Sequence, residues 1–261
     1  MNLETLQRYS DENLAELVRH IARFGEGSTI LEQEGLLLVS GSHAQPGPYR
    51  NFAMRLTEEL SAQAAIARAE QFFRERKRPF VFWVRLHADQ EIESLAHWHP
   101  LEEEGLPQYA ALEPFPEPEP AFGVKVVAPL TEEQRKDFLM VNAEGWGLDG
   151  ASYGLACKML FEPEMLDHPN VIALTAYLTA EPAATCMTIA TPGCAGGYWG
   201  ATANFARRQG LWRLLVTRAF NRSFERGAKV VVCQASKMNE KNTLRLGFRE
   251  VSRYKRYLVT P

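Results

Sequence analysis

The 261-residue sequence lacks long apolar runs, and its cysteines do not form any arrangement typical of a metal site or a disulfide framework. Apolar runs such as 230–233 are far too short to cross a bilayer, and the first residues are polar, unlike a signal peptide. The four cysteines stand at irregular spacings without a CxxC pair or a nearby histidine, which argues against zinc and against disulfides. We therefore expect a folded cytoplasmic protein with buried thiols and no contact with a membrane.

A metal centre is not expected at the histidines either. His97 and His99 stand two residues apart in a helical context, so their side chains point in different directions. No third ligand is nearby in the sequence.

Acidic residues are scarce in the C-terminal part of the chain. Residues 203–261 contain ten Arg and four Lys against three Glu, a net charge of +11, whereas residues 1–202 carry −14. Two interpretations are open: a polyanionic ligand at the C-terminal part, or ion pairing between this part and the acidic remainder. Nucleic acid is disfavoured as a partner because the basic residues are spread over several elements without an aromatic platform.

Proline alternates with acidic and aromatic residues over 112–120, a pattern that blocks helices and favours an extended spacer. We predict a first domain over 1–111, a linker over 112–120 and a second domain over 121–261. Apolar periodicity and turn residues predict an α+β fold with mixed sheets. In the first domain we expect helices over 10–24 and 58–77 and from 89, and strands over 36–40, 51–56, 80–86 and 109–112. In the second we expect strands over 124–127, 171–178, 183–190, 198–205, 229–234 and 249–259, and helices from 131 and over 153–161, 211–226 and 239–246.

The most informative segment is 202–213, where an extended stretch meets a basic turn and then an amphipathic helix. Leu211, Leu215 and Ala219 recur at four-residue spacing and form part of a buried stripe. The first amides of a helix have no partner within it and carry the positive end of its dipole. A phosphate lying over residues 208–213 would satisfy them, and Gly210 lets the backbone approach closely. We call residues 207–210 the glycine turn.

The order of elements over 122–259, the glycine turn, and Leu-Gly-Phe at 246–248 resemble the GNAT (Gcn5-related N-acetyltransferase) superfamily. The family's acyl-CoA motif has Gln or Arg, two residues, Gly, one residue, and Gly or Ala. Arg207, Gly210 and Trp212 occupy these positions, and the first two agree with the motif. The resemblance implies a GNAT fold and an acetyl-CoA-dependent N-acetyltransferase. The acetyl group would pass directly to a primary amine of a small molecule or protein in a ternary complex.

The resemblance also assigns cofactor contacts. An exposed strand edge suits the two amides of pantetheine on physical grounds as well, because it offers backbone donors and acceptors. Pyrophosphate would lie on Arg207, Arg208, Gln209, Gly210, Leu211, Trp212 and Arg213, and pantetheine would lie along Thr202, Ala203 and Asn204, with Ser236 and Asn239 nearby. Acetyl-CoA is the expected cosubstrate, without a metal.

The first domain is similar to a degenerate GNAT-like half. At the corresponding helix start it has Glu58 and Glu59 and no glycine, so a phosphate would be repelled there. We expect no coenzyme A in this half, as in tandem GNAT proteins with one working site.

Acetyl transfer to an amine needs a deprotonated nucleophile, donors for the oxyanion and a proton for the thiolate. Deprotonating an amine with a pKa near 10.4 costs about 4 kcal/mol at neutral pH unless a base assists. No carboxylate lies between Glu181 and Glu225, so the fourth strand cannot supply the base. Glu144, Asp149 and Glu162 remain, and we prefer Glu144 because its loop borders the acceptor site in the family. The alternative is an exposed carboxylate at a helix end.

The family's usual general acid is a tyrosine three residues before the Leu of Leu-Gly-Phe, where this chain has Thr243. A threonine hydroxyl is far too weak an acid to replace it. Tyr254, Tyr198 and Tyr153 are alternatives, and we select Tyr254 because its basic neighbours would lower the pKa of its phenol. The alternative is a tyrosine that only packs on the sheet.

Two departures from the family pattern support a second hypothesis, a non-catalytic acyl-CoA-binding or sensory module. Thr243 lacks the acid function, and Trp212, where Gly or Ala is usual, either covers the phosphates or fills the core. In both hypotheses the glycine turn binds the cofactor. The expected partners are acetyl-CoA and an amine acceptor, and a homodimer stays open.

Overall fold

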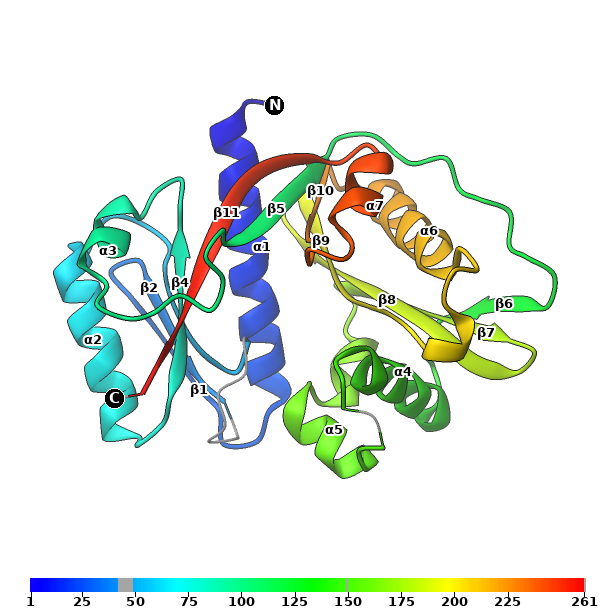
Figure 1. The fold of residues 1–261 in the computed structure, drawn as a ribbon, viewed down its shortest axis with the longest axis horizontal. Helices are drawn as coiled ribbons and strands as arrows, with labels where there is room; N and C mark the ends of the chain where they lie inside the picture. The colour runs from blue at the N-terminus through cyan, green and yellow to red at the C-terminus, as the bar shows by residue number, and fades with distance from the viewer. Residues whose placement is uncertain (42–48, 149, 261) are drawn as a thin grey trace. The chain divides into compact units, whose positions relative to one another are not determined.

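The computed structural model describes residues 1–41, 49–148 and 150–260, so the candidate base Asp149 lies outside the described residues. The chain divides into two compact units (Figure 1). The first comprises Met1–Tyr109 with Gln234–Pro261, and the second comprises Ala110–Cys233. The segment 112–120, predicted as a linker, therefore falls at the start of the second unit. The C-terminal residues that we assigned to the second domain belong to the first unit.

The first unit is a mixed sheet with a helix on each face. Its strands β2, β3 and β4 are buried on both faces, which explains their near-continuous apolar sequences. Within the unit the strand order is β1-β2-β3-β4-β11-β5. The elements are α1 (Leu3–Phe24), β1 (Thr29–Gln33), β2 (Leu36–Ser40), β3 (Asn51–Arg55), α2 (Ala62–Glu75), β4 (Phe80–Arg85), α3 (Gln90–Leu95), β5 (Leu106–Ala111), α7 (Glu240–Arg245) and β11 (Arg249–Val259).

The C-terminal strand completes the first unit. Residues Tyr254–Val259 of β11 pair antiparallel with Phe80–Arg85 of β4. On one face of the sheet α2 packs Ala65, Ala69 and Phe73 into the core, and the Phe73 ring stacks on Phe80 with centroids 4.3 Å apart. The small alanines let the helix approach the strands closely.

Two helix starts in this unit differ from the prediction. Helix α1 begins at Leu3 rather than Ser10, because the Asn2 side chain accepts a hydrogen bond from Thr5 N. Ser10 is instead buried within the helix, and its hydroxyl lies 3.4 Å from Gln108 Oε1. Helix α2 begins at Ala62, capped by Ser61, and not at residue 58. The edge strand β1 was not predicted.

The second unit is also a sheet between helices. Its strand order is β10-β9-β8-β7-β6, in which β9 and β10 are parallel and the other neighbours antiparallel. Helix α6 covers one face and α4 the other (Figure 1). The elements are β6 (Val124–Val127), α4 (Glu132–Gly145), α5 (Tyr153–Met159), the 3₁₀ helix η1 (Pro163–Asp167), β7 (Val171–Leu178), β8 (Glu181–Thr191), β9 (Cys194–Thr202), the 3₁₀ helix η2 (Asn204–Ala206), α6 (Leu211–Glu225) and β10 (Val230–Gln234).

Helix α4 starts where the sequence predicts. Thr131 caps it through Gln134 N at 3.2 Å, and the Gln134 side chain returns a contact to Thr131 N at the same distance. This reciprocal capping box satisfies two amides that the helix leaves open. Across the described residues, no helix is both long enough and apolar enough to span a membrane.

Candidate functional site

The glycine turn presents an open helix start, as predicted. Arg208 and Gly210 both have left-handed backbone conformations, with φ of 65° and 77°, and α6 begins directly after Gly210. The first hydrogen bond of the helix runs from Leu214 N to Gly210 O at 3.0 Å. In the part of the chain that the structure describes, no acceptor contacts the amides of Leu211, Trp212 and Arg213. Three donors and the positive end of the dipole are therefore available to an anion.

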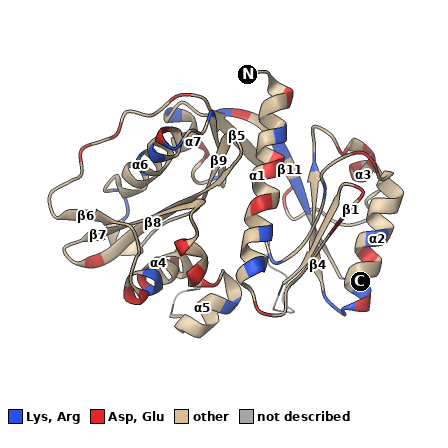
Figure 2. Ribbon diagram, turned by 180° about the vertical axis from the view of Figure 1, so that it is seen from behind, with Lys and Arg blue, Asp and Glu red and all other residues tan. Residues whose placement is uncertain are grey.

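Arginine side chains surround this helix start. Arg207 holds the turn through a long contact from Nε to Thr202 O at 3.5 Å. Arg208 and Arg213 are exposed, and neither forms an ion pair with another described residue. Arg218, farther along α6, is neutralised by Glu117. Figure 2 marks the basic residues of α6 in blue. Arg208 and Arg213 therefore place uncompensated positive charge at the start of the helix, and Arg222 in its last turn likewise has no ion-pair partner among the described residues.

Strand β9 leaves its parallel neighbour before it reaches the glycine turn. The pairing of β10 with β9 covers Cys194–Gly197, and β9 then continues to Thr202. On its other side, β9 has a bulge against β8, because Met187 pairs with Tyr198 but Thr185 pairs with Ala201. A bulge bends the strand and strengthens its twist. The pairing with β10 therefore ends before the stretch of β9 that leads to the open helix start.

Glycines on β9 allow α6 to lie directly on the strand. A Cβ at Gly197 would stand 2.4 Å from the ring of Phe220, and one at Gly200 would stand 3.2 Å from Trp212 Nε1. Trp212 is half-buried and lies against the bulge. Residues 196–197 pair regularly with β10, and the bulge lies at Trp199–Gly200.

Glu144 lies at the end of β9. Its Oε1 accepts a hydrogen bond from Asn204 N at 2.6 Å. Helix α4 can approach β9 closely because its last residue is Gly145. A Cβ added to Gly145 would lie only 2.8 Å from the Cβ of Ala201. The preferred base and the predicted pantetheine edge are thus neighbours within the second unit.

More backbone groups of the segment Thr202–Asn204 form hydrogen bonds within the chain than we expected. Ala203 N donates to Ala183 O at 2.9 Å and Asn204 N donates to Glu144. The carbonyls of Ala203 and Asn204 accept bonds from the short helix η2. The stretch 198–201, which we predicted as strand but did not assign to the cofactor, lies between the last β10 pair and this segment.

Comparison with solved structures identifies this architecture. No family model matches the sequence, and no curated protein matches it. A GCN5-related N-acetyltransferase from Kribbella flavida superposes with a TM-score of 0.71, covering 97% of this chain and 96% of that chain at 14% identity. A tandem GNAT protein from the clavulanic acid biosynthesis pathway gives 0.63, with 95% of both chains covered at 13% identity. The chain has the tandem GNAT fold. Because the identities are low, the similarity establishes the fold and not the activity.

A third solved structure is similar over nearly the whole chain. A GCN5-related N-acetyltransferase from Sphaerobacter thermophilus gives a TM-score of 0.62 at 15% identity, with 96% of this chain and 94% of that chain covered. The predicted GNAT fold is confirmed.

Tyr254, our candidate acid, is a core residue of the first GNAT unit. Its side chain is fully buried, and its hydroxyl donates to the carboxylate of Asp11. The basic neighbours that suggested a lowered pKa lie on the other face of β11, because successive strand residues alternate. Arg253 pairs with Glu250 at 2.6 Å and Lys255 pairs with Glu93. An acid role for Tyr254 would require this phenol to leave its carboxylate partner.

The other predicted contacts from the C-terminal segment also lie in the first unit. The Ser236 carbonyl accepts from Asn239 N at 2.8 Å, which starts the turn into α7. Thr243, at the position of the family's tyrosine, is buried, and its hydroxyl donates to Asn239 O at 3.1 Å. The Thr243 hydroxyl is therefore used by its own helix. The roles of Ser236 and Asn239 in cofactor binding stay predictions.

Both interpretations of the basic C-terminal part have support. In β11, Lys255 and Arg256 pair with Glu93 and Glu102 of the first unit, which is the internal pairing that we considered. In the second unit Arg208 and Arg213 form no ion pair with any described residue. The basic residues of β11 therefore form ion pairs within the chain, whereas Arg208 and Arg213 are available to a ligand.

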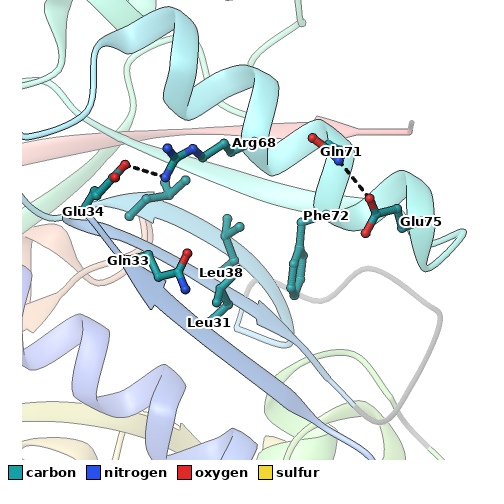
Figure 3. Close-up of a pocket in the computed structure, with 9 residues that line it drawn as sticks. Leu31, Gln33, Glu34, Leu38, Arg68, Gln71, Phe72 and Glu75 are labelled. Carbon is teal, nitrogen blue, oxygen red and sulfur yellow. Dashed lines mark hydrogen bonds and ion pairs between the residues drawn. The ribbon is translucent and has the colours of Figure 1, made fainter.

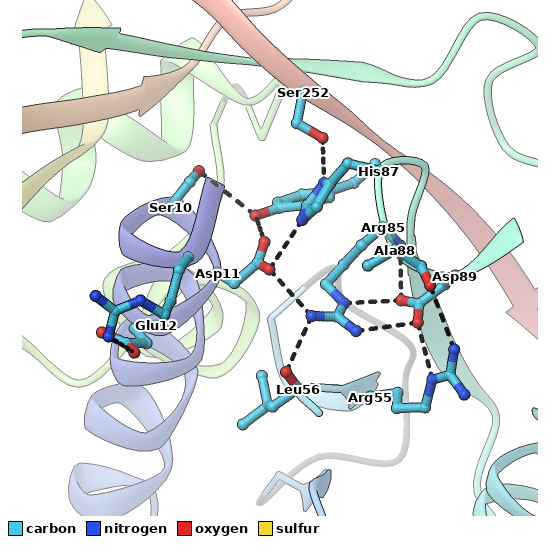
Figure 4. A network of polar contacts seen from close by, with 12 residues as sticks. Ser10, Asp11, Glu12, Arg55, Leu56, Arg85, His87, Ala88, Asp89 and Ser252 are labelled. Atoms are coloured by element: carbon cyan, nitrogen blue, oxygen red, sulfur yellow. Dashed lines mark hydrogen bonds and ion pairs between the residues drawn. The ribbon is translucent and has the colours of Figure 1, made fainter. Parts of the chain in front are cut away.

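A buried ion network lies at the end of the parallel strand pair in the first unit. Strands β3 and β4 are parallel up to the pair Met54–Trp83, and an arginine follows on each. Figure 4 shows both arginines converging on Asp89. Arg55 Nε lies 2.9 Å from Asp89 Oδ1, and Arg85 Nε lies 2.8 Å from Asp89 Oδ2. Both side chains are almost completely buried.

Further bonds extend this buried network. Arg85 Nη1 contacts Asp11 Oδ2 at 3.1 Å, and His87 Nε2 lies 3.1 Å from the same oxygen. The carboxylates hold the pKa of Arg85 above its usual range against the opposing effect of burial. Helix α2 has its own cap, Ser61, whose hydroxyl accepts from Ala64 N at 3.2 Å. The buried charges of this network are therefore paired within the chain, and Ser61 caps one amide of the α2 start.

Proposed function

We propose that the protein is an acetyl-CoA-dependent N-acetyltransferase that acts on a primary amine of a small molecule or a protein. The observation that carries this proposal is the open start of α6 at Gly210, with unpaired arginines beside it, next to the point where β9 leaves β10. The diphosphate of coenzyme A matches the open helix start. Its two amides match β9, which continues beyond its last pair with β10.

In this proposal the pyrophosphate lies on the amides of residues 208–213. Arg208 and Arg213 add charge, and Trp212 lies between the phosphates and the β9 bulge. The pantetheine amides lie along β9 and the segment after it, beyond the last β10 pair, from residue 198 to Asn204.

The reaction is a direct transfer within the ternary complex. The amine nitrogen attacks the acetyl carbonyl carbon, the carbon–sulfur bond breaks, and the amine proton passes to a base. Glu144 is the proposed base because its carboxylate lies at the end of β9 and its second oxygen is available for an amine. The departing thiolate takes its proton from water, since Thr243 is no acid and the Tyr254 phenol is bound to Asp11.

A non-catalytic acyl-CoA-binding module is the second candidate. The buried Thr243 hydroxyl, bonded within α7, favours it because the family's acid is missing. The two candidates share the cofactor site and differ only in turnover.

The test is release of coenzyme A thiol from acetyl-CoA in the presence of a panel of primary amines. We expect release with at least one class of amine. Glu144→Gln should lower kcat/KM by about a hundredfold, the typical contribution of a general base, and Glu164→Gln, an exposed carboxylate of the same unit, should leave it unchanged. Binding of acetyl-CoA without release for any amine would favour the non-catalytic module. Equal activity of the two variants would remove Glu144 from the mechanism.

A further inference from the structure

The bulge of β9 holds a bulky residue in a left-handed backbone conformation. Trp199 has a φ of 52°, in a region that favours glycine and in which a large side chain is an outlier. It stands within the bulge, where Tyr198 pairs with Met187 but Ala201 pairs with Thr185. Such a conformation costs free energy and persists only where the surrounding structure imposes it. The contacts of Trp199 therefore need an explanation.

Two hydrogen bonds in series hold the carbonyl of Trp199. The Thr185 hydroxyl donates to Trp199 O at 3.2 Å, and it accepts from Asn142 Nδ2 at 2.9 Å. The same Nδ2 donates its other hydrogen to Phe138 O at 3.0 Å, within α4. Because Asn142 supplies the hydrogen between itself and Thr185, the Thr185 hydrogen is directed to Trp199 O. We call Asn142 and Thr185 the relay.

The side chain of Trp199 is held as well. Its ring centroid lies 4.9 Å from that of Phe161 and 5.4 Å from that of Trp146. Phe161 is completely buried, and Trp146 follows the end of α4. The strained residue is therefore fixed at both its carbonyl and its ring.

The relay belongs to a buried polar cluster that lowers stability. Asn142, Thr185 and Thr175 are completely buried, and Thr175 is the cross-strand partner of Thr185. Among the described residues, neither Asn142 Oδ1 nor the Thr175 hydroxyl has a hydrogen-bond partner. Each such atom loses its hydration without a replacement, which costs free energy. A chain that keeps polar groups at this cost has a reason other than packing.

Polar side chains at the cavity between β1 and α2 of the first unit show the contrast. Figure 3 shows Arg68 and Glu34 bonded to each other beside this cavity. These side chains are 45% and 57% exposed, so water competes with their contact and weakens it. The relay is shielded from water, and its hydrogen bonds therefore have more influence on the backbone that they hold.

The held carbonyl fixes the direction of the next amide. In a trans peptide the C=O and N–H groups point in opposite directions, and no peptide bond of the described residues is cis. The Trp199 carbonyl points to Thr185 of β8, so the Gly200 N–H points away from β8. On that side of β9 the pairing with β10 has already ended, at Gly197. The Gly200 amide therefore points to the edge along which we place pantetheine.

We propose that Asn142 and Thr185 are positioning residues for the cofactor. By holding the Trp199 carbonyl they keep the β9 bulge in its left-handed form, and they aim the Gly200 N–H at a carbonyl of the acyl-pantetheine arm. Both act through the backbone of β9 and do not touch the cofactor themselves. This positioning role rests on the proposed function, because it needs acyl-CoA bound along β9.

Thr185→Val tests the relay, because valine has nearly the shape of threonine but no hydroxyl. The Kd for acetyl-CoA, measured calorimetrically with the full chain, should rise about tenfold, the effect of one lost hydrogen bond. ADP carries the diphosphate without the pantetheine arm, so its Kd, measured by displacement of acetyl-CoA, should stay unchanged. The coupling between the amide and α hydrogens of Trp199, measured by NMR, should change as φ leaves the left-handed region.

Thr175→Val is the matched control. It removes a hydroxyl from the same buried cluster, at the cross-strand partner of Thr185, and this hydroxyl does not contact the bulge. Neither Kd should change in this variant. Thr185→Ser keeps the hydroxyl and should bind acetyl-CoA as the wild type does.

Four results decide between the two levels of this account. Equal Kd values of Thr185→Val and Thr175→Val for acetyl-CoA would overturn the positioning role. Equal weakening of acetyl-CoA and ADP by Thr185→Val, or an effect of this variant on the urea midpoint alone, would also overturn it. A wild type that binds no acetyl-CoA would instead refute the proposed function, and the positioning role with it.

Discussion

Replacing Gly210 by aspartate tests the glycine turn directly. Gly210 is exposed, and a Cβ added to it would meet no atom within 4 Å. Its φ of 77° is left-handed, a conformation that Asp and Asn tolerate better than other side chains. Gly210→Asp should therefore fold, and it places a carboxylate beside the three open amides of α6.

The magnitude follows from Coulomb's law. A carboxylate about 5 Å from a diphosphate of about two charges is repelled by about 2 kcal/mol in the dielectric of water and by about 7 kcal/mol at an effective dielectric of about 20. We therefore expect the Kd for acetyl-CoA to rise at least tenfold. Gly210→Asn is the control, because it has the same shape without the charge.

Calorimetric titration with acetyl-CoA measures both variants. The effect of Gly210→Asp should shrink as the salt concentration rises, since the site is exposed and salt screens the repulsion. Equal Kd values for the aspartate and asparagine variants would refute the assignment of the diphosphate to this turn.

Two predictions concern the fold. Asp89→Ala leaves two buried arginines without their shared carboxylate, so the free energy of unfolding in urea should fall by about 3–5 kcal/mol. The control Glu12→Gln, in the exposed pair with Arg8, should change it by less than about 0.5 kcal/mol. A small effect of Asp89→Ala would contradict the structural role of the network. Burial raises the pKa of Cys186 from 9.0 to about 12, so the unfolded chain loses this proton first, and stability should fall as the pH rises above about 9. Cys186→Ala should lessen that fall, and identical pH dependence in the variant would show that this thiol does not contribute.

Much of the fold could be predicted because its signals are local. Strands β6, β7 and β11 have the predicted bounds, since alternation and flanking turn residues act within a few positions. The capping box at Thr131 is likewise a local pattern. Helix α1 was predicted too short because Ser10 looked like a cap, whereas Asn2 supplies one earlier in the chain.

The pairing of distant segments could not be predicted in this way. Strand β11 pairs with β4, more than 160 residues away in the sequence, and an apolar alternation does not specify its partner. The assignment of Tyr254 as an acid was also based only on residues close to it in the sequence. Its basic neighbours are close in sequence but lie on the opposite face of the strand, and its true partner, Asp11, comes from α1.

At the candidate site the helix start after the turn and most of the strand before it could be predicted, but the bulge within that strand could not. The φ of Gly210 and the open amides follow from a glycine before an amphipathic helix. The bulge at Trp199–Gly200 depends on the register between β8 and β9, and a glycine within a strand was its only sequence signal. The contact between Glu144 and Asn204 N depends on how α4 packs on β9, which no local pattern determines.

We propose that this tandem GNAT fold holds one cofactor site, at the glycine turn, and that the first unit binds no acetyl-CoA because Arg55, Arg85 and Asp89 form a closed buried network there. Calorimetric titration of the full chain with acetyl-CoA measures the number of sites. We expect one equivalent of acetyl-CoA bound per chain. No binding would contradict the site at Gly210, and two equivalents would contradict the closure of the first unit.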